Sequence, residues 1–114
     1  MPDMYRCTDK NIPLPENFGT SANNPNDWVR PLPDGSLNVN HAGAIAVALS
    51  SARSGSEAFQ RLIATTPLPA AEKRLVRKIV SRKRQPKVKE LLLVMPALMN
   101  AIPISVVALT WQLS

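Results

Sequence analysis

The sequence has 114 residues, a length typical of one domain, and it is 45% apolar and 19% charged, so the chain is not disordered throughout. A single cysteine, Cys7, and a single histidine, His41, exclude a disulfide scaffold and the cysteine and histidine patterns of zinc modules. Two Trp, two Phe and one Tyr are too few for a surface that stacks the bases of single-stranded nucleic acid.

Residues 1–40 are rich in proline and asparagine. Each proline removes a backbone donor and pushes the preceding residue towards extended conformations, so no helix is expected here. The sequence Pro-Asp-Gly-Ser at 33–36 predicts a tight turn. Isolated apolar residues, among them Phe18, Trp28 and Leu32, are spaced like anchors. We expect an extended, irregular arm over 1–40 that lays these anchors on a neighbouring surface; the alternative is a terminus without fixed structure.

From about residue 40 the spacing of apolar residues changes to that of helices. The pattern predicts three helices, over about 40–52, 56–65 and 69–84. Either Asn38 or Asn40 is placed to cap the first of them. This first helix is rich in alanine, which permits close packing.

The helix expected at 69–84 has the clearest amphipathic pattern in the chain, with apolar residues on one face and basic residues on the other. The stretch 73–89 contains nine basic side chains and no acidic one. They are Lys73, Arg74, Arg77, Lys78, Arg82, Lys83, Arg84, Lys87 and Lys89. Such a run contacts phosphates, lipid head groups or an acidic protein surface, or else it is a solvated face that keeps an apolar protein soluble. Few side chains that read base edges lie among these charges, so any contact with nucleic acid is expected to be independent of sequence.

Residues 91–114 contain no charged side chain, and the stretch is as long as a membrane-spanning helix. Basic residues precede it, as on the cytoplasmic side of a tail anchor. Pro96 and Pro103 interrupt it, and the cost of proline inside a helix offsets the gain from inserting its aliphatic residues. We therefore expect short buried helices, one over about 87–95 and one opening at Pro96 that Pro103 bends or restarts. The alternative is a tail-anchored protein with a transmembrane segment over 91–113.

No combination of residues in the sequence is typical of an active site. His41 is expected at a helix start and Cys7 in the arm, and neither has a catalytic partner nearby in sequence. Most carboxylates lie in the arm, where a catalytic pair or a cluster for a hard metal ion would have to form on irregular chain. We expect no enzyme activity, no catalytic residue, no metal site and no cofactor.

The sequence thus predicts an all-α protein, a small bundle of four to five short helices over about 41–114 that follows the arm at 1–40. We interpret it as a non-enzymatic structural or interaction subunit of a larger assembly, comparable to a virus- or phage-particle component or an inhibitor of a host complex. The arm would embrace a neighbour, either another protein or a further copy of the chain. The basic helix would face a polyanion, including nucleic acid, or an acidic partner. We expect the protein in the cytoplasm or within an assembled particle. If it is instead tail-anchored, we expect it at a membrane, held there by residues 91–113.

Overall fold

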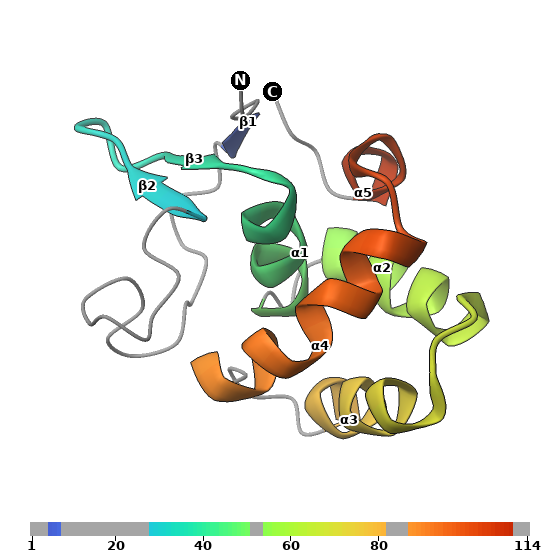
Figure 1. The fold of residues 1–114 in the computed structure, drawn as a ribbon. Helices are drawn as coiled ribbons and strands as arrows, with labels where there is room; N and C mark the ends of the chain where they lie inside the picture. The colour runs from blue at the N-terminus through green and yellow to red at the C-terminus, as the bar shows by residue number, and fades with distance from the viewer. Residues whose placement is uncertain (1–4, 8–27, 51–53, 82–86, 111–114) are drawn as a thin grey trace.

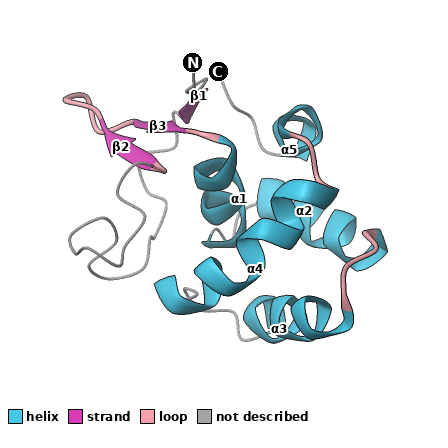
Figure 2. Cartoon of the chain, in the orientation of Figure 1, coloured by secondary structure: helices cyan, strands magenta, loops and turns pink. Residues whose placement is uncertain are grey.

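A computed structural model describes residues 5–7, 28–50, 54–81 and 87–110 of the chain. Its elements, in chain order, are β1 (Tyr5–Cys7), β2 (Val29–Pro31), β3 (Leu37–Val39), α1 (His41–Ser50), α2 (Ser54–Thr65), α3 (Ala70–Ser81), α4 (Val88–Ala101) and α5 (Ile104–Thr110). The strands gather at one side of the molecule, and the helices make up the rest of the described structure (Figure 2). α1 contacts the sheet through β3 and packs against α2, α4 and α5, so it lies at the centre (Figure 1).

The prediction of an all-α protein is wrong in one respect, because described parts of the predicted arm form a small antiparallel sheet. The strand order is β1-β3-β2. In the central strand, Val39 lies opposite Tyr5 of β1 and Val29 of β2. Successive side chains of a strand point to opposite faces and directly opposed residues share a face, so Cys7, Val29 and Val39 lie on one face, and all three are buried in the core. The intervening residues of the predicted arm, Phe18 among them, lie outside the described residues.

The strands of the sheet were not predicted, for three physical reasons. Each strand has only three residues, too few to show an alternating pattern, and β2 includes Pro31. The proline is tolerated because β2 is an edge strand, where a missing N–H breaks no bond within the sheet. The pairing of β1 with β3 also joins segments far apart in the sequence, which a local pattern does not reveal.

The turn predicted at 33–36 is confirmed and joins β2 to β3. The N–H of Gly35 donates to the carbonyl of Leu32 at 2.9 Å, and the N–H of Leu32 donates to the carbonyl of Ser36 at 2.8 Å. Gly35 has a φ of 90°, a conformation that a residue with a Cβ rarely adopts. Pro33 precedes it at the turn position where a fixed φ is favourable. These features close a hairpin with a three-residue loop.

α1 is surrounded by the rest of the protein, and every residue from 42 to 50 is buried. Asn40 caps the helix, because its Oδ1 accepts the N–H of Gly43 at 2.8 Å. The backbone of Trp28 crosses the helix at this point, and its carbonyl also accepts the N–H of Asn40 at 3.0 Å. A Cβ added to Gly43 would lie 2.0 Å from that carbonyl oxygen. Only glycine therefore fits where the sheet approaches α1.

The two helices that follow α1 are amphipathic, as the pattern over 69–84 predicted for the second of them. α2 buries Phe59 and Ile63, and α3 buries Val76 and Ile79. α3 begins at Ala70, one residue later than expected, and the end of the predicted helix at 82–84 lies outside the described residues.

The helix boundary predicted at Pro96 is wrong, since α4 continues through this residue. Proline has no N–H for the carbonyl of Leu92, four residues earlier, but both residues are exposed, so water can satisfy that carbonyl. The helix ends instead before Pro103, and α5 leaves α4 at an angle of 102°. His41 Nε2 donates to the carbonyl of Ile102 at 2.7 Å, which ties this bend to the first residue of α1.

No single helix in the described ranges is long and apolar enough to cross a membrane, although α4 and α5 meet the length and composition requirements jointly, as a bent pair. Leu91 and Leu98 of α4, and Ile102 at the bend, are almost fully buried in the core of the protein.

Candidate interaction surface

α3 separates apolar from basic side chains. Val76 and Ile79 pack into the core, whereas Arg74, Arg77 and Lys78 are exposed. The sequence produces this division because residues three and four positions apart lie on the same face of a helix. Lys73, which lies between the two faces, is half-buried.

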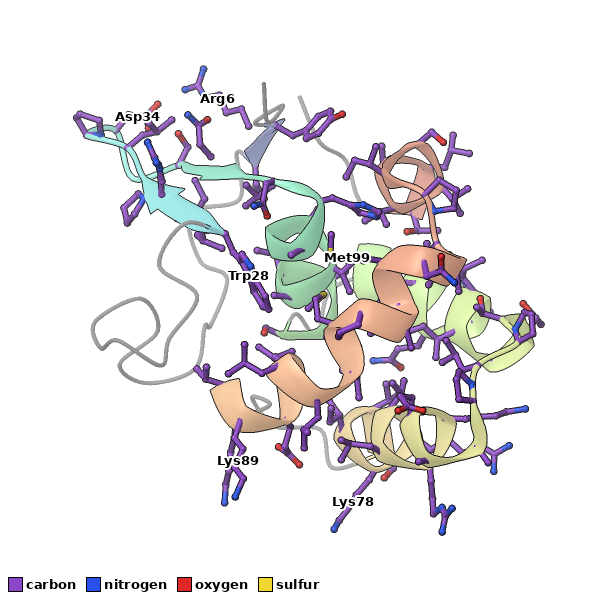
Figure 3. The ribbon with its side chains drawn as sticks, viewed as in Figure 1. Arg6, Trp28, Asp34, Lys78, Lys89 and Met99 are labelled. Atoms are coloured by element: carbon purple, nitrogen blue, oxygen red, sulfur yellow. The ribbon has the colours of Figure 1, made fainter. Side chains whose placement is uncertain are left out.

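The N-terminal end of α4 adds two exposed cations, Lys87 and Lys89. The backbone N–H of Lys87 donates to Glu90 Oε1 at 3.0 Å, which satisfies one of the free donors where the helix begins. α3 packs against α4. Lys78 and Lys89 therefore point away from the body on the same side of the molecule (Figure 3).

We call the exposed cations of α3 and of the start of α4 the basic surface; they are Arg74, Arg77, Lys78, Lys87 and Lys89. The two acidic residues on these elements, Glu72 and Glu90, are half-buried. Every charged side chain that is exposed on α3 or at the start of α4 is thus a cation. The structure brings together six of the nine predicted contact residues, counting Lys73, and the other three, Arg82, Lys83 and Arg84, lie outside the described residues.

A second exposed surface was not predicted. Leu93 is 61% exposed, Leu92 42% and Met99 37%, and Pro96 beside them is also exposed. We call these four residues the α4 apolar face. The sequence offers no separate signal for it, because residues 92, 96 and 99 recur at helical spacing opposite positions that are equally apolar. The absence of charge from the whole stretch concealed this division.

The outer end of the sheet carries a polar network in the hairpin loop. The Ser36 hydroxyl and N–H both donate to Asp34 Oδ1, the N–H at 2.9 Å, and Arg6 pairs with Asp34 Oδ2. The bonds from Ser36, with a further contribution from the Arg6 guanidinium, lower the pKa of Asp34 from 3.8 to about 2. The network holds the turn and joins β1 to the hairpin (Figure 3).

Two of the predicted anchors, and both residues considered for catalysis, lie where they contribute to the fold. Trp28 is half-buried and packs against the core, and Leu32 is half-buried at the turn. His41 bonds to the carbonyl at the bend between α4 and α5, and Cys7 is buried in β1. Among the described residues, no group of three His, Cys, Asp or Glu side chains is placed to hold a metal ion.

No family model, curated protein sequence or solved structure matches this chain.

Proposed function

We propose that this protein is a non-enzymatic interaction subunit that binds a polyanion through the basic surface. The observation that carries the proposal is the sorting of charge on α3 and α4. Arg74, Arg77 and Lys78 are exposed in the same region as Lys87 and Lys89, and the acidic neighbours are less exposed. A surface of one sign attracts a partner of the opposite sign over a distance of about 10 Å at moderate ionic strength.

The chemistry of these side chains favours phosphate groups as the contacts. Arginine binds phosphate with two parallel hydrogen bonds, and lysine binds it as a point charge. Contacts of this kind position a nucleic acid partner but do not distinguish one base sequence from another. We therefore expect binding that depends on charge density and not on nucleotide sequence.

The test uses duplex DNA as a polyanionic probe. With four to six phosphate contacts, the logarithm of the binding constant should fall against the logarithm of salt concentration with a slope of about −3.6 to −5.4. Arg74→Glu with Arg77→Glu should weaken binding to all sequences equally and reduce the size of that slope by about 2.

The matched control reverses two exposed arginines away from the basic surface, Arg30 on β2 and Arg61 on α2. This variant has the same net charge as the first, so it separates the position of the charge from its amount. Equal loss of DNA binding in both variants would mean that only the net charge matters, which contradicts the proposal. Unchanged DNA binding after the Arg74 and Arg77 reversal would also contradict it.

A second candidate is a tail-anchored membrane protein, favoured by the joint length and composition of α4 and α5. It requires that the bend of 102° straightens and that Leu91, Leu98 and Ile102 leave the core. Extraction of membranes with alkaline carbonate tests it, because a spanning helix stays with the lipid and a surface-bound protein is released. Retention of the full chain in the membrane pellet would favour this candidate.

A further inference from the structure

The α4 apolar face and the basic surface meet on one helix. Lys89 lies three and four residues before Leu92 and Leu93, so these side chains occupy adjacent turns of the same side of α4. Pro96 and Met99 continue that side towards the end of the helix. The exposed side of α4 therefore begins with a cation and continues with large apolar groups.

The size of the apolar face limits what can cover it. A stable protein interface takes about 20 to 30 residues from each partner. The α4 apolar face has four partly exposed residues, and Lys89 and Asn100 adjoin it on the same side of the helix. A second copy docked on this face alone would bury too little apolar surface for a stable dimer.

An anionic lipid bilayer needs fewer apolar contacts. A surface helix binds by burying a narrow apolar face about 5–10 Å into the boundary between head groups and acyl chains, while cations beside it remain among the phosphates. Leu92 and Leu93 supply the apolar contact, and Lys89 is placed for a head group. Lys87 and the cations of α3, which packs against α4, add attraction from the same region.

We propose that the protein docks on the surface of an anionic membrane, with the α4 apolar face in the bilayer boundary and the basic surface against its phosphates. This inference rests on the proposed function and names the polyanion as a lipid surface. It differs from the tail anchor, because the buried side of α4 stays in the core and no helix crosses the bilayer.

The test is sedimentation of the full chain with vesicles of three parts phosphatidylcholine to one part phosphatidylglycerol. The wild type should bind these vesicles and should bind pure phosphatidylcholine at least about tenfold more weakly, because the head-group attraction is lost. Leu92→Ser with Leu93→Ser should weaken binding to the anionic vesicles by at least about tenfold, because it removes buried apolar area. The matched control is Leu109→Ser, which changes an 86% exposed leucine on α5 and should leave binding unchanged.

Binding to duplex DNA separates failure of this inference from failure of the proposed function. The Leu92 and Leu93 variant should retain wild-type DNA binding, and an unchanged circular dichroism spectrum shows that it is folded. If the wild type binds DNA but not the anionic vesicles, the inference is wrong and the proposed function stands. If it binds neither, both are wrong. If the serine variant sediments with vesicles like the wild type, or its only effect is to abolish self-association, the α4 apolar face is not a lipid contact.

Discussion

α1 and α4 are both apolar helices, yet the protein uses them differently. α1 is buried all round, between the sheet on one side and α2, α4 and α5 on the others. α4 buries one side, including Leu91 and Leu98, and exposes Leu92 and Leu93 on the other. Its exposed side begins at a cation, Lys89, whereas α1 contains no Lys, Arg, Asp or Glu.

The difference follows from side-chain size and position. The alanines and glycine of α1 let neighbours approach from several directions, and at Gly43 the approaching group is backbone. α4 has leucines on both sides: those on one side pack into the core, and those on the other side are exposed. Apolar composition alone therefore does not predict burial. Whether a neighbour is present on each side decides it, and the following substitutions test that statement.

The largest expected effect separates the two sides of α4. Leu98→Asp places an unpaired charge at a site with no exposure, and should destabilise the protein by about 3–5 kcal/mol or unfold it. Leu93→Asp makes the same change on the exposed side and should shift the unfolding free energy by about 0.5 kcal/mol or less. Urea denaturation followed by circular dichroism measures both. Equal destabilisation would mean that Leu93 is buried.

The next effect tests the close approach on α1. Gly43→Val puts side-chain atoms into the space of the Trp28 carbonyl, which lies 2.0 Å from an added Cβ, and should cost about 1–3 kcal/mol or more. Ala64→Val, at an exposed position of α2, introduces the same β-branched side chain into a helix without such a neighbour. Its effect on the urea midpoint should be much smaller, and comparable shifts would place the sheet farther from α1.

A smaller effect concerns the start of α1. Asn40→Ala removes the acceptor for the N–H of Gly43 and should destabilise the protein by about 1 kcal/mol. The matched change is Asn38→Ala, at the other asparagine considered as a cap, which instead lies in the middle of β3. Thermal unfolding of the two variants compares them, and an equal or larger loss at Asn38 would contradict the assigned cap.

The smallest effect is the pH dependence of the hairpin beside α1. The pKa of Asp34 is about 2 in the folded protein and 3.8 in the unfolded chain, so its contribution to stability is complete above about pH 5 and is lost as pH falls through 3.8 and then 2. An NMR titration of the Asp34 carboxyl should therefore have its midpoint near 2. Because Ser36 contributes most, Ser36→Ala should raise that midpoint more than Arg6→Ala. A wild-type midpoint near 3.8 would mean that the loop network is absent.

Much of the helical architecture follows from local sequence. The turn before β3, the cap at Asn40 and the amphipathic division of α3 each depend on residues within a few positions of one another. Pro103 was expected to interrupt the apolar stretch, and it does so. Pro96 was expected to do the same, but α4 continues through it, and Leu92, the residue whose carbonyl Pro96 leaves unpaired, is exposed.

The basic part of the candidate surface was visible in the sequence, and the apolar part was not. Arg74, Arg77 and Lys78 are polar residues at helical spacing opposite apolar ones, so their exposure could be predicted. Leu92 and Leu93 belong to a run in which every residue is apolar, and no pattern there separates buried from exposed positions. The location of Lys89 beside the cations of α3 also depends on the packing of α3 against α4.

The sequence by itself determined most of the helix positions, where charge concentrates and where a turn forms at 33–36, because propensity, capping and turn chemistry act between near neighbours in the chain. Only the tertiary structure decided that β1 pairs with β3, that Gly43 lies against the Trp28 carbonyl and that α4 keeps one apolar side exposed. Each of these depends on which distant segment fills the space beside a residue. Burial is a property of that space, and the residue alone does not specify it.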